Sequence, residues 1–107
     1  MRILEFNVIK QRLTKKLTCD FGGLVAGTVG YLQAKFYFSE NEWGGCANRV
    51  ARFWLDGVEH AVLLDSNNSC VIPSAVLTGS KFEVSVLGAA PGYRIETNKI
   101  NVRQEVH

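Results

Sequence analysis

Alternation of apolar and polar residues at every second position is the feature that most constrains the fold of this chain. The segment 31–38 shows it clearly, because Leu32, Ala34 and Phe36 would share one side of an extended strand. A period of two favours β-strands with one buried face, whereas an amphipathic helix has a period of about 3.6 residues. No stretch longer than a turn or two keeps the helical period. The sequence therefore predicts a protein that is nearly all β.

Turn and cap residues divide the chain into eight or nine short strands. Asp56-Gly57 is typical of a type I′ hairpin, because both central residues of that turn need positive φ. Ser39 followed by Glu42 is a capping-box pattern, which predicts one helical turn with Trp43 folded back onto the core. A proline at the head and a glycine at the tail of segment 73–79 frame a second helical turn. The expected strands are 2–9, 12–18, 31–38, 50–55, 58–64, 70–72, 82–86, 93–97 and 100–106.

Length and composition point to one globular domain, residues 1–107. The chain is 47% hydrophobic and 21% charged, which is ordinary for a domain that folds around a single core. Short strands at this spacing predict an all-β fold, a single immunoglobulin-like antiparallel β-sandwich with one or two single-turn helices in its connections. The alternative is a small five-stranded barrel like the oligonucleotide-binding (OB) fold.

Residues that carry out catalysis or bind metals are few and scattered. Cys19, Cys46 and Cys70 are separated by 26 and 23 residues, and the two histidines are His60 and His107. Neither gap between the cysteines has the close spacing of a zinc or redox site. The sequence also contains no phosphate-binding loop, GxSxG elbow or HExxH motif. We therefore predict a protein that is not an enzyme and has no catalytic residues, no cofactor and no metal site.

The amino end and the cysteine content bear on localisation. No apolar run approaches the roughly 20 residues of a membrane span, and the first residues are polar at every second position, unlike a signal peptide. An odd number of cysteines fits a reducing compartment. We expect synthesis in the cytoplasm, no secretion by a signal peptide and no membrane partner.

Positive charge is concentrated near the amino end. Residues 1–35 carry six cations and two anions, whereas the remainder carries six cations and eight anions, so that the formal net charge is +2. Such a basic segment can steer an acidic partner, or it can simply keep an outer strand from pairing with other chains. The cations of the predicted first hairpin are Lys10, Arg12, Lys15 and Lys16.

A second candidate surface combines aromatic and basic residues. Tyr31, Lys35 and Tyr37 lie on the non-core side of one predicted strand. If the next strand follows the alternation that puts Ala51, Phe53 and Leu55 inside, Val50, Arg52 and Trp54 join that outer side. Such a face can stack the bases of single-stranded nucleic acid, or form the centre of a protein interface. Plain packing under loops is the third interpretation, and nucleic acid is the least favoured partner. The candidate partner-binding residues are therefore Lys10, Arg12, Lys15, Lys16, Tyr31, Lys35, Tyr37, Arg52 and Trp54.

Five segments of the chain share a pattern with one family of domains: Leu32–Gly45, Ala51–Trp54, Ala61–Asp65, Cys70–Leu77 and Phe82–Gly88. The pattern is an aromatic strand ending in a Phe-Ser-x-x-Trp turn, an apolar-x-Phe strand, an Ile-Pro-x-x-Val-Leu plug and a strand rich in Val and Gly. In these segments the chain resembles small β-sandwich domains encoded by phages and prophages of Gram-positive bacteria, which form the amino-terminal domains of baseplate and tail-fibre proteins. The similarity covers residues 31–102, with one extra residue between Ser39 and Trp43.

The resemblance implies a scaffold that docks onto a phage particle. Since the chain ends at His107, we expect a free-standing copy, made in the bacterial host cytoplasm and carried in the virion. It would be a structural or accessory protein of tail, baseplate or head-decoration type, which contacts other virion proteins or forms a homo-oligomer. The alternatives are a phage-encoded inhibitor that binds a host defence nuclease through the basic hairpin, and single-stranded nucleic-acid binding. The core that the resemblance implies contains Phe6, Leu32, Phe36, Phe38, Trp43, Phe53, Val62, Leu64, Ile72, Val76, Leu77, Phe82, Val84 and Val86.

Overall fold

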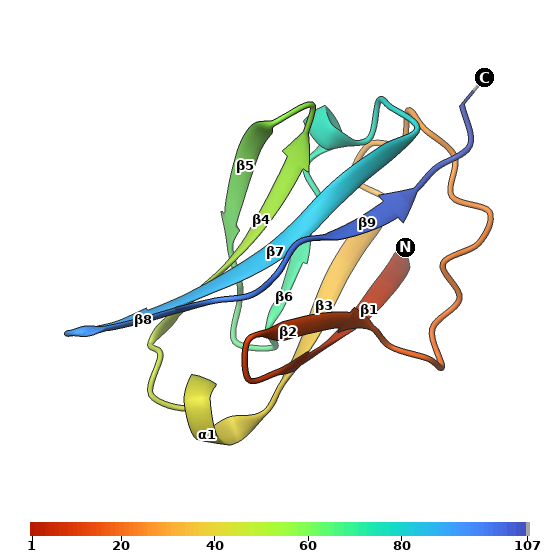
Figure 1. The fold of residues 1–107 in the computed structure, drawn as a ribbon. Coiled ribbons are helices and arrows are strands. Elements are labelled where there is room, and N and C mark those ends of the chain that lie inside the picture. The colour runs from red at the N-terminus through yellow and green to blue at the C-terminus, as the bar shows by residue number, and fades with distance from the viewer. Residues whose placement is uncertain (107) are drawn as a thin grey trace.

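A computed structural model describes residues 1–106, and for residues 40 and 41 it describes the backbone alone. Strands make up most of the regular structure in this part of the chain, and the only helices there are two short ones (Figure 1). Within residues 1–106 no helix is long and apolar enough to cross a membrane. The elements are β1 (Arg2–Ile9), β2 (Arg12–Lys15), β3 (Leu32–Phe38), α1 (Glu40–Trp43), β4 (Asn48–Leu55), β5 (Val58–Leu63), β6 (Ser69–Val71), the 3₁₀ helix η1 (Ser74–Val76), β7 (Lys81–Ala90), β8 (Tyr93–Glu96) and β9 (Ile100–Arg103).

The strands form two sheets that pack face to face (Figure 1). The first sheet has the order β2-β1-β3-β6. The second has the order β5-β4-β7, and the two ends of the long strand β7 pair with β8 and β9. The predicted all-β sandwich with single-turn helices in its connections is confirmed, and the barrel alternative is not the arrangement found.

One strand pair departs from the antiparallel arrangement that was expected. β1 and β3 run parallel, with Arg2 opposite Leu32 and Val8 opposite Phe38. The long connection 16–31 is the cause, because it returns the chain to the end of the sheet where β1 began (Figure 1). There the N–H of Arg2 donates to the carbonyl of Tyr31 at 2.9 Å.

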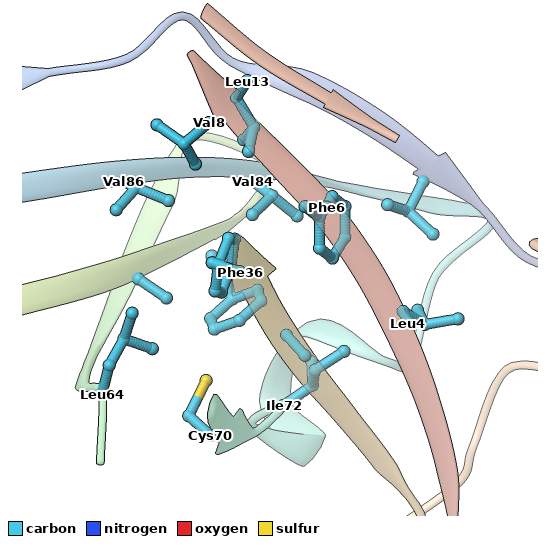
Figure 2. Close-up of a cluster of buried hydrophobic side chains, with 14 of the residues drawn as sticks. Leu4, Phe6, Val8, Leu13, Phe36, Leu64, Cys70, Ile72, Val84 and Val86 are labelled. Carbon is cyan, nitrogen blue, oxygen red and sulfur yellow. The ribbon is translucent and has the colours of Figure 1, made fainter. Parts of the chain in front are cut away.

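The core lies between the sheets and follows the alternation of the sequence (Figure 2). All the expected core residues are buried except Phe38 and Val62, which are partly buried. The rings of Phe6 and Phe36 stack at 5.1 Å between centroids, so that neighbouring strands of the first sheet pack side by side. Burying each large apolar side chain contributes roughly 1.5–3 kcal/mol before entropy is subtracted.

The crossover from β3 to β4 is fixed by Trp43. Its side chain is fully buried, as the sequence predicts, and its Nε1 donates to the carbonyl of Lys10 at 2.7 Å. The expected hairpin at Asp56-Gly57 is confirmed, since both residues have positive φ, 50° and 80°. β2 ends at Lys15, earlier than predicted, and β7 reaches Ala90, later than predicted.

Candidate protein interface

The nine candidate residues do not share one face. β3 belongs to the first sheet and β4 to the second, so Tyr31, Lys35 and Tyr37 lie on the opposite side of the sandwich from Arg52 and Trp54. The expectation of a single aromatic and basic face is therefore wrong. The physical reason is the α1 crossover between β3 and β4, which carries the chain from one sheet to the other. Both strands keep their apolar sides inward, but their polar sides then point in opposite directions.

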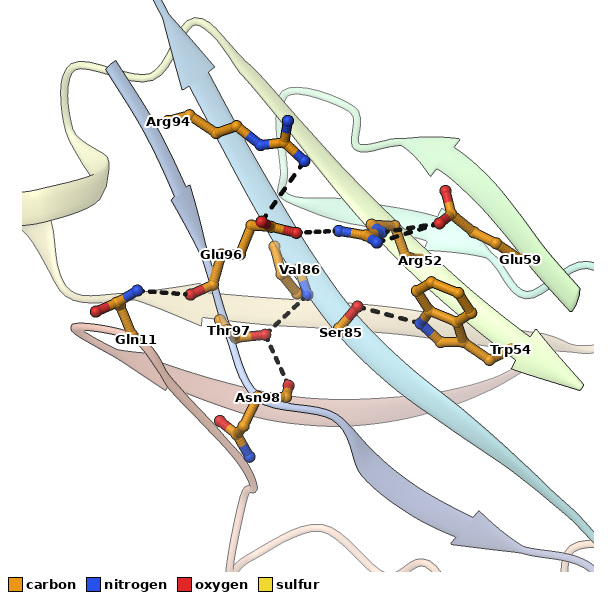
Figure 3. A network of polar contacts seen from close by, with 10 residues as sticks. All are labelled: Gln11, Arg52, Trp54, Glu59, Ser85, Val86, Arg94, Glu96, Thr97 and Asn98. Carbon is orange, nitrogen blue, oxygen red and sulfur yellow. Dashed lines mark hydrogen bonds and ion pairs between the residues drawn. The ribbon is translucent and has the colours of Figure 1, made fainter. Parts of the chain in front are cut away.

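On the second sheet the charge of Arg52 is already neutralised (Figure 3). Its side chain is only 17% exposed and lies between two carboxylates, Glu59 at 3.2 Å and Glu96 in a direct ion pair. The hydrogen bond from Arg52 lowers the pKa of Glu96 below its ordinary value, and the nearby charge of Arg94 lowers it further. Arg52 therefore has little capacity left for an anionic partner.

Trp54 is likewise occupied by residues of its own chain. Its Nε1 donates to the hydroxyl of Ser85 at 3.2 Å (Figure 3). The ammonium of Lys99 lies 3.8 Å from the ring centroid and the guanidinium of Arg52 lies 4.9 Å from it, both within cation–π range. A ring covered in this way is not an open platform for stacking a base.

On the first sheet a basic cluster occupies the outer side of β1 and β3. Glu5 lies opposite Lys35 in the parallel register and accepts a hydrogen bond from the hydroxyl of Tyr37. The Lys16 ammonium lies 4.2 Å from the Tyr37 ring centroid and 3.9 Å from the Glu5 carboxylate. The hydrogen bond to Glu5 raises the pKa of Tyr37 above its ordinary value. Two amines and one carboxylate leave this cluster with a positive charge.

Exposed apolar side chains flank the cluster at both ends. Ile3 and Val71 each lie opposite Gln33 in the register of the sheet, and Tyr31 precedes the same strand. All three apolar or aromatic side chains are roughly half exposed, and Ile9 is exposed at the far end of β1, opposite Arg12. We call this surface the first-sheet outer face, with the residues Ile3, Ile9, Arg12, Lys16, Tyr31, Lys35, Tyr37 and Val71.

Two of the hairpin cations lie apart from this face. Lys10 occupies the β1–β2 turn with a positive φ of 55°, next to a shallow depression of about 570 Å³ that Gln11 and Arg12 also line. Lys15 lies opposite the inward-facing Phe6, and its ammonium is 5.2 Å from the ring of Phe21. Of the four cations that the sequence suggested, Arg12 and Lys16 belong to the first-sheet outer face.

The cysteines and carboxylates form no metal-binding cluster in the described part of the chain. No group of three His, Cys, Asp or Glu residues within 1–106 is placed to hold a metal ion. Cys46 and Cys70 are buried, and Cys19 is partly buried. Burial raises the pKa of Cys70 to about 12, and the charge of Asp65 adds to the shift, so this thiol is neutral and a poor nucleophile at neutral pH.

Sequence reasoning missed the apolar members of the first-sheet outer face, although a signal was present. In segment 2–9 the alternation that buries Leu4 also places Ile3 and Ile9 on the side of Glu5, where polar residues are expected. A contiguous patch of exposed apolar residues, unlike a single one, marks an interaction surface.

No protein-family model matches this chain, and no curated protein sequence matches it. The fold and its surfaces are therefore the basis for a functional proposal. They define a small all-β sandwich domain with a basic, apolar-flanked sheet face.

Proposed function

We propose that the protein is a non-enzymatic structural or accessory protein of a phage particle, which acts through protein–protein contacts. The observation that carries the proposal is the first-sheet outer face, where aromatic and apolar side chains surround a positive centre and remain exposed. The resemblance of residues 31–102 to phage baseplate and tail-fibre domains supports the virion setting. Tail, baseplate and head-decoration positions are all consistent with such a face.

The composition of the face favours a protein partner with an acidic surface. Tyrosine and arginine are enriched at the centres of protein interfaces. Arg12, Lys16 and Lys35 outnumber the single carboxylate of Glu5, so complementary negative charge would speed association and set the orientation. Because these charges are partly exposed, we expect the affinity to fall as salt rises.

The experiment compares particles that carry wild-type and charge-reversed chains. The face variant is Arg12→Glu with Lys35→Glu, and the matched control, Lys81→Glu with Arg103→Glu, reverses two exposed charges on the second sheet. Circular dichroism and thermal melting establish that both variants fold. We expect the wild-type and control chains in purified particles, and the face variant to be depleted. Absence of the wild-type chain, or equal incorporation of the face variant, would contradict the proposal.

A second candidate is an inhibitor that binds a host defence nuclease through the basic hairpin. The observation that favours it is the depression beside the β1–β2 turn, which Lys10 and Arg12 flank. Affinity capture from host lysate should then recover a nuclease at low salt and lose it at high salt. Lys10→Glu should abolish this recovery, and capture of no nuclease by the wild-type chain would exclude the candidate.

Single-stranded nucleic-acid binding has the weakest support of the three. The separation of Tyr37 from Trp54 on opposite sheets removes the shared platform on which that hypothesis depended. We therefore expect no quenching of Trp54 fluorescence by single-stranded oligonucleotides at low salt, where such binding is strongest. Saturable quenching would restore the hypothesis.

A further inference from the structure

The edges of the two sheets differ in whether their backbone groups are available. An outer strand exposes a row of N–H and C=O groups that can pair with another chain unless something blocks them. At β2 the block is the side chain of Asn98. Its Oδ1 accepts from the N–H of Leu13 at 2.8 Å, and its Nδ2 donates to the carbonyl of the same residue at 3.4 Å. A single amide thus takes the place that a neighbouring strand would occupy.

The edges formed by β6, β8 and β9 are short, and a side chain blocks one position on each of β6 and β8. At β6, Asp65 accepts the N–H of Ser69 at 3.0 Å through Oδ1 and donates its own N–H to the Ser69 carbonyl at 3.0 Å. At β8, the carbonyl of Glu96 accepts from the side chain of Gln11. β9 is four residues long and carries the exposed charge of Arg103.

β5 has no such protection, although it forms the outer edge of the second sheet (Figure 1). The N–H of Leu64 donates to the carbonyl of Arg49 at 2.9 Å. These two residues lie opposite each other, one position beyond the pair of Val50 and Leu63. Hydrogen-bonded pairs alternate along an antiparallel ladder, so Glu59, Ala61 and Leu63 point their backbone groups away from β4. Among the described atoms, which exclude the side chains of residues 40 and 41, no group outside the β4–β5 pair forms a hydrogen bond with these backbone groups.

The side chains of β5 also do little to keep another strand away. The strand has one charged residue, Glu59, and lacks the lysines and proline that commonly guard an edge. The carboxylate of Glu59 is already held by Arg52. Val58 is 58% exposed and Leu63 is 62% exposed, so the strand offers apolar contacts at both ends.

We propose that β5 pairs antiparallel with β5 of a second copy of this chain, which joins the second sheets of two molecules into one. A two-fold axis perpendicular to the sheet leaves the outer faces of both second sheets on the same side of the joined sheet. This symmetry allows only registers in which the two paired residues lie on the same face of that sheet. The register that uses all three available positions places Ala61 opposite Ala61 of the second copy. It also places each Glu59 opposite Leu63 of the other chain.

Charge and symmetry favour a second copy as the occupant. Antiparallel pairing of a strand with itself is self-complementary, which is the requirement of a two-fold interface. In this register the two Glu59 side chains stand four residues apart, about 13 Å along the strands, which exceeds the screening length at physiological salt. Each Glu59 keeps its own Arg52, and the methyl groups of the two Ala61 residues leave the axis uncrowded.

This pairing goes beyond the proposed virion role and uses a different part of the molecule. A contact that consists of one strand edge buries less than the roughly 1,200 Å² of a standard interface, so the dimer should be weak and reversible. The first-sheet outer face remains exposed on both copies, because it belongs to the other sheet.

Cross-linking tests the register directly. In a Cys19→Ser background, Ala61→Cys is treated with a short bis-maleimide, and Thr14→Cys, exposed on the blocked edge of β2, is the matched control. Cα atoms of a hydrogen-bonded antiparallel pair lie about 5.5 Å apart, so Ala61→Cys should give a covalent dimer in high yield. Thr14→Cys should give only the background of random collisions. Equal yields at the two positions would overturn the proposal.

Sedimentation equilibrium provides the second measurement. The wild-type chain should fit a monomer–dimer equilibrium, and Ala61→Lys should weaken the dimer by at least about tenfold, because it places two ammonium groups at the axis. Thr14→Lys should leave the equilibrium unchanged. A wild-type chain that remains monomeric at about 1 mM, or a dimer that Ala61→Lys does not weaken, would also overturn the proposal. Neither result affects the incorporation experiment, which tests the virion role by itself.

Discussion

Replacing Gly88 with alanine should destabilise the fold, because the indole of Trp43 occupies the space that a side chain would need. A Cβ at this position would lie 2.7 Å from Cζ3 and 2.8 Å from Cε3 of the indole, and 2.9 Å from Sγ of Cys46. The ring cannot move aside easily. Its Nε1 donates to the carbonyl of Lys10, and its centroid lies 4.9 Å from that of Phe38.

The expected cost follows from overpacking a filled core. Inserting one extra carbon into well-packed surroundings costs about 1–3 kcal/mol. A loss of 1 kcal/mol lowers the melting temperature of a domain near 100 residues by about 4–8 °C, so Gly88→Ala should melt at least a few degrees below the wild type. The measurements are urea unfolding at equilibrium and thermal melting followed by circular dichroism.

Gly45→Ala is the matched control, since nothing lies within 4 Å of the Cβ it would add and its φ is not positive. It should change the unfolding free energy by less than about 0.5 kcal/mol. Trp43→Phe removes the two indole carbons nearest to Gly88, so Gly88→Ala should cost less in that background. If Gly88→Ala costs no more than Gly45→Ala, the packing of Trp43 against β7 is refuted.

Three further substitutions test two polar contacts and the burial of one thiol. Asn98→Ala removes both hydrogen bonds to Leu13, so the unfolding free energy should fall by about 1–2 kcal/mol and amide hydrogen exchange at Leu13 should quicken; unchanged exchange would contradict the role of Asn98 at the β2 edge. The pKa of Cys70 is 9.0 in the unfolded chain and is raised to about 12 in the folded protein, so only the unfolded chain loses this proton between the two values. The unfolding free energy of the wild type, measured in urea, should therefore fall relative to that of Cys70→Ala as the pH rises over this range. A difference between the two free energies that stays constant would contradict the burial of this thiol. Since the pKa of Glu96 is lowered, Arg52→Gln should cost stability above pH 4.5, and urea unfolding should show that this cost shrinks as the pH falls below that value. A cost that does not depend on pH would argue against the ion pair.

The sequence was sufficient to locate the strands, although not the ends of β2 and β7, because burial on one face imposes a period of two that can be counted along the chain. It was also sufficient for the turn at Asp56-Gly57, where local geometry restricts the residue types. The parallel pairing of β1 with β3 was not predictable in the same way. It depends on the path of residues 16–31, which the guanidinium of Arg2 fixes through hydrogen bonds to the carbonyls of Asp20 and Gly22.

The candidate surfaces were predictable only in part. Alternation places Lys35 and Arg52 on the solvent side of their strands, but it does not say which sheet each strand joins. That assignment depends on the α1 crossover and on the packing of Trp43. The blocked edges were also hidden, because Asp65 and Asn98 lie in polar connections where such residues usually serve local turns.

Carbodiimide cross-linking of purified phage particles, which joins lysine amines to carboxylates, is the most direct test of the central claim, that the first-sheet outer face docks onto another virion protein. The cross-linked peptides are identified by mass spectrometry. The account predicts cross-links from Lys16 and Lys35 to one acidic segment of a single virion protein. Lys81, on the second sheet, and Lys99, in the β8–β9 connection, remain unlinked to it. Absence of the chain from the particles, or cross-links from Lys81 and Lys99 alone, would contradict the account.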